Sequence, residues 1–196
     1  LAVRALWESW QHQTRLNYQG EFYQLTLMTP FFSPAPHAYS RIPIFVAGVN
    51  RRMCELAGEL CEGFHVHPLH TERYLREKIL PNIESGLAKS GRLRQAMELS
   101  SSIFVIPTDE PEQASKYEAD VRQQIAFYAS TPPYRPVFDL EGWGETADEL
   151  KALAARSQWN EMPALINHEM LDRFALRGTW TELPAKLQKK YHGLLD

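Results

Sequence analysis

The sequence lacks the features that mark membrane, secreted and nucleic-acid-binding proteins. No apolar run approaches the roughly 18–20 residues that a membrane-spanning helix requires, and no signal peptide opens the chain. A net charge of −3 leaves no basic excess for a nucleic acid to bind. From these absences we expect a cytoplasmic protein with neither a membrane nor a nucleic-acid partner.

Cysteine is scarce as well. The only two, Cys54 and Cys61, lie seven positions apart in a helical pattern, which separates them by about 10 Å along a helix axis. That distance is too long for a disulfide within one helix. We therefore expect both thiols to be reduced and buried.

Internal repeats, low-complexity tracts and the common nucleotide-binding motifs are also missing. Neither G-x-x-x-x-G-K-[ST] nor G-x-G-x-x-G occurs. The chain opens on Leu1 rather than Met, which suggests a processed, engineered or partial version of something longer. Its 196 residues, 44% of them hydrophobic, predict a globular protein that is a single domain or a piece of one.

What the sequence does contain is an alternation of short apolar runs and helical patterns over residues 42–130. The apolar runs predict strands buried on both faces, at 42–47, 64–67 and 97–107. Helices are predicted between these strands and over 109–128. Because strand–helix–strand units with short loops form right-handed parallel crossovers, the fold class is α/β.

The first two predicted helices carry recognisable ends. Asn50 and Thr71 are their predicted N-caps. Glu62-Gly63 ends the first helix, and Pro81 is predicted to kink the second.

Two segments flank these β/α units. Residues 1–41 predict a helix, a hairpin and a proline-rich loop, and residues 131–196 predict a loop and a helical tail. In the tail the predicted caps are Thr146 (in a capping box with Glu149), Asn160 and Thr181, with Gly178 ending one helix. The aromatic-rich stretch 127–144 could cover a planar ligand, but we favour its packing the tail helices onto the core.

The turn after the first predicted strand is a candidate anion site. Ligands of parallel α/β folds bind at the carboxyl ends of the strands, which is where Ala47-Gly48-Val49-Asn50 lies. Gly48 would let a ligand approach the backbone, and the free N–H groups of the helix start would favour a phosphate. Arg51 and Arg52 would add charge. The alternative is a tight turn with solvated arginines.

Histidines follow the second predicted strand. His65 and His67 lie on one side of it and His70 follows in the loop, so a metal site is geometrically conceivable. Such a site needs carboxylates from neighbouring strand ends, and Asp109 is the best candidate. We favour His65 and His67 as polar residues that line a pocket, at least one of them with a structural role.

Three stretches resemble the C-terminal part of luciferase-like monooxygenases, in particular the branch of F-420-dependent oxidoreductases. They are PIFVAGVNRRMCELAGELCEGFHVHP, YLREKILPNIESGLAKSGR and FVIPTDEPEQASKYEADVRQQIAFYASTPPYRPVFDLEGW. The resemblance implies a (β/α)8 TIM barrel that binds FMN or coenzyme F-420, a deazaflavin. The residues at 42–47, 63–67 and 97–105 would be its sixth, seventh and eighth strands. The cofactor phosphate would lie at Ala47, Gly48, Val49, Asn50, Arg51 and Arg52.

The resemblance also implies that half of the barrel is missing, since a complete one takes about 250 residues. The expected fold is therefore a partial barrel, roughly strands six to eight, with a helical C-terminal tail. The expected function is hydride transfer to or from a small organic substrate in the full-length enzyme, with little activity in this chain alone. No catalytic residue is predicted.

Two alternatives remain open. One is a non-catalytic half-barrel that self-associates, so that the partner would be a second copy rather than the missing N-terminal half. The other is a metal-dependent hydrolase that uses His65, His67 and His70. Glu62-Gly63, where the family often has Asp-Gly, is a mild departure from the pattern.

Overall fold

The computed structural model describes residues 1–39 and 41–196, which form two compact units, Leu1–Pro43 and Ile44–Asp196. The predicted boundary between the N-terminal segment and the β/α units, at 41 and 42, lies close to this division. Ser40, in the predicted proline-rich loop, lies outside the described residues. In the part of the chain that is described, no helix combines the length and apolarity needed to cross a bilayer.

The first unit contains the predicted helix and hairpin. Helix α1 (Ala2–His12) is followed by the antiparallel pair β1 (Tyr18–Gln19) and β2 (Gln24–Leu25), and a short 3-10 turn, η1 (Pro30–Phe32), interrupts the proline-rich loop. The indole N–H of Trp10 donates to the Met28 sulfur at 3.1 Å, which ties the helix to the segment after the hairpin.

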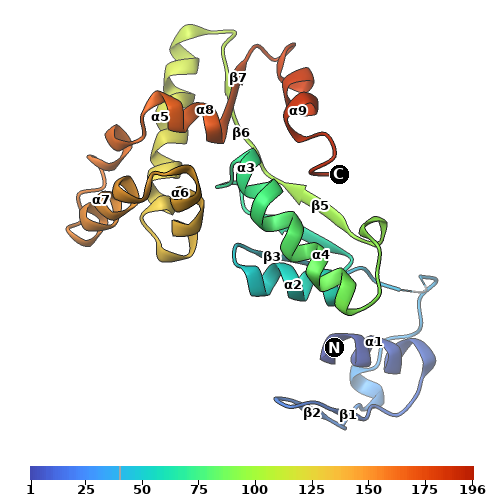
Figure 1. Cartoon of the computed structure of the whole chain (residues 1–196). Helices are drawn as coiled ribbons and strands as arrows, with labels where there is room; N and C mark the ends of the chain where they lie inside the picture. Colours follow the sequence, from blue (N-terminus) through green and yellow to red (C-terminus); the bar gives the residue numbers. More distant parts are fainter. Residues whose placement is uncertain (40) are drawn as a thin grey trace. The chain divides into compact units, whose positions relative to one another are not determined.

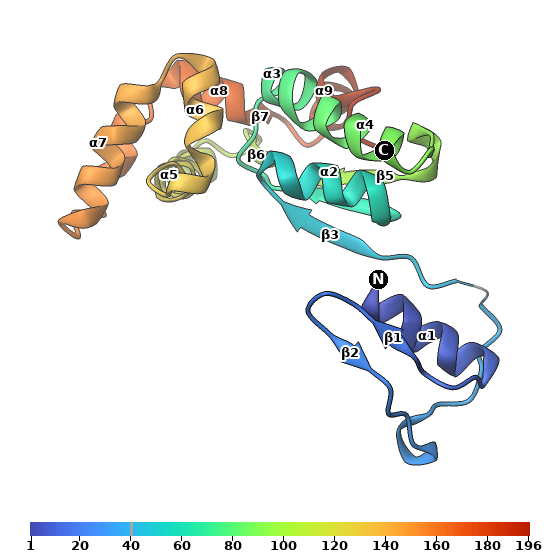
Figure 2. The same cartoon turned by 60° about the horizontal axis from the view of Figure 1, so that its bottom comes forward.

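The second unit is built on a parallel sheet of β3 (Phe45–Gly48), β4 (Gly63–Val66) and β5 (Glu98–Ser101), in that order. Helix α2 (Arg51–Leu60) connects β3 to β4, and a longer helical segment connects β4 to β5. Both helical connections lie on the same face of the sheet (Figures 1 and 2). The predicted parallel β/α units are confirmed.

The helical segment between β4 and β5 is distorted near Pro81. It comprises α3 (Glu72–Tyr74), a π-helical turn η2 (Leu75–Ile79) and α4 (Leu80–Lys89). Proline has no N–H to donate within the helix, and the wider turn just before it accommodates the break. The predicted cap at Thr71 is confirmed, since its Oγ1 accepts from Tyr74 N–H at 3.1 Å.

Helices α2 and α4 pack closely through two glycines. A Cβ on Gly58 would overlap the Ile83 carbonyl oxygen, and one on Gly86 would overlap the Glu55 carbonyl oxygen. The two backbones therefore approach without side chains between them. Cys54 on α2 and Cys61 directly after it, predicted to be buried free thiols, are both buried and unbridged. Burial raises the pKa of Cys54 to about 11, so its thiol stays protonated.

The prediction of a single third strand over residues 97–107 is wrong. The segment forms two strands, β5 and β6 (Phe104–Pro107), which belong to different sheets. At the end of β5, Ser101 Oγ lies 2.9 Å from the Val66 carbonyl oxygen and 3.0 Å from that of Ser102, so its one O–H has two main-chain acceptors within reach.

The predicted all-helical tail also needs correction, because it contains a strand. Residues Ala175–Gly178 form β7, which pairs parallel to β6, whereas the sequence predicts a helix that continues to Gly178. Helix α8 ends at Phe174 because the next four residues, Ala175–Gly178, pair with the edge of β6. The remaining elements are η3 (Arg94–Ala96), α5 (Pro111–Ala129), η4 (Pro132–Tyr134), α6 (Arg135–Glu141), α7 (Gly144–Ala155), η5 (Met162–Leu165), α8 (His168–Phe174) and α9 (Leu183–Tyr191).

The predicted caps of the tail helices are wrong. Helix α7 begins two residues before Thr146, and α9 follows Glu182 rather than Thr181, neither with a side-chain cap. Asn167 rather than Asn160 caps α8, its Oδ1 accepting from Met170 N–H at 2.9 Å. Within 127–144 the favoured packing role is supported, since Phe138 is fully buried and stacks on Phe174.

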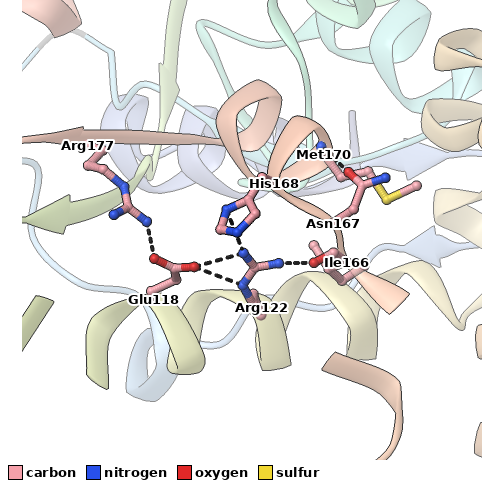
Figure 3. A network of polar contacts seen from close by, with 7 residues as sticks. All are labelled: Glu118, Arg122, Ile166, Asn167, His168, Met170 and Arg177. Carbon is pink, nitrogen blue, oxygen red and sulfur yellow. Dashed lines mark hydrogen bonds and ion pairs between the residues drawn. The ribbon is translucent and has the colours of Figure 1, made fainter. Parts of the chain in front are cut away.

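A polar network attaches β7 and the start of α8 to α5 (Figure 3). The Glu118 carboxylate lies between the guanidinium groups of Arg122 and Arg177 and accepts from both. Arg122 also donates to the Ile166 carbonyl and to His168 Nδ1. The hydrogen bond from Arg122, more than that from Arg177, lowers the pKa of Glu118 against the opposing effect of burial. The carboxylate therefore stays ionised and holds the two segments together.

Candidate functional site

A cavity of about 760 Å³ opens at the carboxyl ends of β3, β4 and β5. Four segments line the cavity. They are the end of β3 with the start of α2 (Ala47, Gly48, Val49, Asn50 and Met53), the end of β4 and the loop after it (His65, Val66, His67 and Pro68), the end of β5 and the residue after it (Ser100, Ser101 and Ser102), and η4 (Pro133 and Tyr134). None of these described residues carries a fixed charge. The walls are therefore apolar surface interrupted by hydroxyl, imidazole and main-chain groups.

Gly48 lies where β3 turns into α2, and its small size is needed for packing. A Cβ at this position would lie 2.6 Å from Cβ of Met53, and the φ angle of Gly48 is not among the positive ones. The glycine thus lets the first turn of α2 fold back closely over the strand. As a result the start of the helix lies directly at the cavity.

The first turn of α2 leaves main-chain donors free. Asn50 occupies the predicted N-cap position, but its side chain makes no capping hydrogen bond. The first helical N–H groups with a described partner are those of Met53 and Cys54, which donate to Asn50 O. The N–H groups of Arg51 and Arg52 have none within the described residues. A helix start of this kind favours an anion.

The two arginines differ in their surroundings. Arg51 Nε lies 2.5 Å from Glu55 Oε1, and Lys89 Nζ lies 2.8 Å from Glu55 Oε2. The two hydrogen bonds lower the pKa of Glu55 to about 2, and the bond from Lys89 has the larger effect. Arg52 is exposed and has no ion pair among the described residues. Neither arginine lines the cavity, so their predicted contact with a phosphate stays a prediction.

His65 pairs across the sheet with Ser100. The two residues are opposite each other in the register of β4 and β5, and His65 Nδ1 lies 2.6 Å from Ser100 Oγ. The Phe45 ring lies beside the imidazole, with 5.4 Å between ring centroids. His65 is one of the residues that line the cavity.

His67 also lines the cavity, in the loop that follows β4. Its Nδ1 accepts from Leu69 N–H at 3.1 Å, and its ring contacts Tyr128 and Tyr134, each with a centroid separation of 4.5 Å. Burial lowers the pKa of His67. The side chain is therefore held neutral in a fixed orientation.

His70 is 2% exposed and separated from the cavity wall by the turn. Its Nδ1 lies 2.7 Å from the His67 carbonyl oxygen, which can only accept, so Nδ1 carries the proton. Burial lowers the pKa of His70 to about 4. No cluster of three His, Cys, Asp or Glu side chains suited to a metal ion occurs in residues 1–39 and 41–196.

The sequence interpretation missed three serines of this site. Ser100, Ser101 and Ser102 line the cavity at the end of β5. The run of three hydroxyls at a predicted strand end was the available signal, because strand ends of a parallel sheet gather at one edge. Tyr134, which the sequence places in a stretch predicted to cover a ligand or to pack the tail helices, also lines the cavity.

Comparison with known proteins gives the family. The luciferase-like monooxygenase family matches the chain over residues 1–196. The chain belongs to this family.

Individual relatives agree with this assignment. An uncharacterized protein of Mycobacterium tuberculosis is 41% identical over 196 residues, which is all of this chain and 57% of that protein. The 5,10-methylenetetrahydromethanopterin reductase of Archaeoglobus fulgidus is 26% identical over 167 residues, 82% of this chain and 47% of the relative. The chain thus spans about half the length of the curated relatives it matches.

The fold has a solved counterpart. The structure of the coenzyme F420-dependent tetrahydromethanopterin reductase from Methanopyrus kandleri superposes with a TM-score of 0.68 at 16% sequence identity. The match covers 98% of this chain and 52% of that one. The predicted partial (β/α)8 barrel is confirmed as the fold class.

Proposed function

We propose that this chain forms the cofactor-binding part of a deazaflavin-dependent oxidoreductase, with the cofactor in the cavity at the ends of β3, β4 and β5. The observation that carries the proposal is the position of that cavity against the open first turn of α2. Relatives in the family are F-420-dependent by name, which favours F-420 over FMN.

The residues present fit such a ligand. Free N–H groups at the helix start suit a phosphate, and the α2 surface around them keeps a positive charge because Arg51 and Lys89 share the single carboxylate of Glu55. The apolar wall of the cavity beside Tyr134 suits a planar ring. When bound, F-420 would supply a site for two-electron hydride transfer to or from a small organic molecule.

The chain's own part in this chemistry is binding and orientation. The loop after β4 and the serines after β5 supply uncharged donors and acceptors, while the face of α2 supplies electrostatic attraction. Among the described residues of the cavity only the two histidines and Tyr134 are titratable, and burial raises the pKa of Tyr134. We therefore expect this chain to bind the cofactor without turning it over.

The binding test is a fluorescence titration of the purified chain with F-420 and, separately, with FMN. Ser102 lines the cavity with an exposed side chain, so Ser102→Trp fills the space without disturbing the core. We expect that variant to abolish F-420 binding. Ser115→Trp, on the exposed face of α5, is the matched control and should bind as the wild type does. Equal binding by both variants would contradict the assigned site.

A separate assay tests the lack of turnover. The visible absorption of F-420 mixed with the chain should stay constant when small alcohols and ketones are added with the reduced or oxidised cofactor. Steady consumption of the cofactor would show that these residues suffice for catalysis.

The open edge of β3 supports a second candidate, a self-associating half-barrel. Ile44 O accepts from Gly63 N–H, so the alternate residues Phe45 and Ala47 direct their main-chain groups away from β4. No further described strand pairs with β3. Such an edge recruits another strand, either from the rest of a barrel or from a second copy. Light scattering distinguishes these cases, since a monomer at high concentration would exclude pairing between copies.

A further inference from the structure

The strongest unexplained feature of the cavity is the hydrogen-bonding state of His67. A main-chain N–H can only donate, so the hydrogen bond from Leu69 N–H fixes Nδ1 as an acceptor. A neutral imidazole with an accepting Nδ1 carries its proton on Nε2. The ring therefore offers one N–H donor, and the tautomer follows from the fold of the loop.

The orientation of this donor is fixed as well. The ring lies against Tyr128, edge to face, and against Tyr134 in a tilted arrangement. The carbonyl of His67 accepts from His70 Nδ1, which holds its backbone. A side chain restrained by two neighbouring rings and at one nitrogen loses little further freedom when a ligand binds.

Nothing in the described residues uses the Nε2–H group. His67 lines the cavity, and no hydrogen bond from its Nε2 is found within residues 1–39 and 41–196. His65 differs, because its ring is exposed and its Nδ1 lies against the Ser100 hydroxyl, which can donate or accept and so does not fix the tautomer. A half-buried, neutral, oriented donor that faces no protein acceptor is suited to an acceptor on a ligand.

We propose that Nε2–H of His67 donates a hydrogen bond to an oxygen atom of the bound deazaflavin, either a ring carbonyl or a phosphate oxygen. This assignment rests on the proposed function and makes His67 a positioning residue of the cofactor site. The donor is uncharged, so it orients the ligand through geometry rather than through attraction at a distance.

Two crossed substitutions separate this role from a structural one. In His67→Gln the amide N–H lies near the place of Nε2, whereas in His67→Asn the amide oxygen lies near the place of Nδ1 and keeps the Leu69 contact. If Nε2–H binds the ligand, the Asn variant should bind F-420 roughly 3- to 10-fold more weakly, and the Gln variant close to wild type. The reverse order would assign His67 a role in holding the loop and overturn the proposal.

The probes are F-420, its phosphate-free deazariboflavin and inorganic phosphate. Weaker binding of both deazaflavins by the Asn variant indicates a ring carbonyl; weaker binding of F-420 and of phosphate alone indicates the phosphate. Equal affinity of wild type and both variants overturns this inference but leaves the proposed function intact. Absence of F-420 binding by the wild type overturns both.

A spectroscopic measurement on the wild-type chain does not depend on any variant folding. Long-range ¹H–¹⁵N correlation should show His67 as the Nε2–H tautomer, with its Nε2 signal shifting when F-420 is added. The Nδ1–H tautomer, or an Nε2 signal that does not respond to saturating F-420, would contradict the proposal.

Discussion

Asp196 bonds both main-chain groups of Leu99. Its N–H donates to the Leu99 carbonyl at 2.9 Å, and its Oδ2 accepts from Leu99 N–H at 2.8 Å. Leu99 lies on β5, and these are the groups that face away from β4, since Glu98 N–H donates to Glu62 O. Asp196 therefore occupies the edge of the sheet opposite β3, and the Arg94 guanidinium at 2.8 Å completes its contacts.

Replacing this residue should loosen the edge of β5. Asp196→Ala leaves Leu99 N–H without its acceptor, and we expect the free energy of unfolding to fall by about 1 kcal/mol, since the side chain is half exposed. Urea unfolding followed by circular dichroism measures this. Glu84→Ala, an exposed acid on α4 with no described contact, is the control. A loss of the same size in both variants would contradict a specific role.

Gly86 should not tolerate a methyl group. In an exposed helix Gly→Ala stabilises by about 1 kcal/mol, but here the new Cβ would overlap the backbone carbonyl of Glu55 on α2. The helices would have to separate, so we expect Gly86→Ala to destabilise the chain by about 1–3 kcal/mol. Ser85→Ala, on the exposed face one residue earlier, should be neutral or slightly stabilising. Thermal unfolding of the two variants, compared with the wild type, shows whether each substitution raises or lowers the stability.

How far the sequence predicts this molecule depends on how local each feature is. The apolar runs at 42–47 and 64–67 and the caps between them are determined within a few residues, and β3, β4 and α2 are close to where they were predicted. Strand β7 depends instead on the free edge of β6, some seventy residues earlier in the chain. Its four residues show no alternation that would have separated it from a helix.

The features of the candidate site also differ in whether local sequence or distant contacts determine them. That a turn containing Gly48 and an H-x-H segment meet at one edge follows from the parallel topology, which the sequence predicts. The Arg51–Glu55 pair is local, since the two residues lie four positions apart on one helix. The tautomer of His67 depends on one main-chain N–H in the next turn, and the second contact of Glu55 depends on Lys89 from another helix. Such contacts need the tertiary structure.

Neutralising Glu118 should weaken the attachment of β7 and α8 to α5. Glu118→Gln keeps the size of the side chain but leaves the guanidinium groups of Arg122 and Arg177 without a counter-charge, and we expect a loss of about 1–2 kcal/mol. Asp120→Asn removes a negative charge from the exposed face of the same helix and should cost much less.

The same carboxylate predicts a pH dependence. The hydrogen bond from Arg122 is the main reason that the pKa of Glu118 is lowered in the folded chain. The stability that ionised Glu118 contributes is therefore present above the ordinary pKa of glutamate and is lost as the pH falls through the lowered pKa. Wild-type stability should therefore decline on acidification in this range more steeply than that of Glu118→Gln. Parallel declines would show that the network contributes nothing to folding.

The two arginines of α2 should contribute unequally to cofactor binding. Arg51 is held by Glu55, and its removal leaves that carboxylate paired with Lys89, whereas Arg52 has no described ion pair and lies in the same free turn. We expect Arg52→Ala to weaken F-420 binding roughly 2- to 5-fold at low salt and Arg51→Ala to weaken it less. The difference should shrink as salt screens exposed charges. Fluorescence titrations at two ionic strengths measure both effects, and a larger loss for Arg51→Ala would mean that the guanidinium leaves Glu55 to reach the ligand.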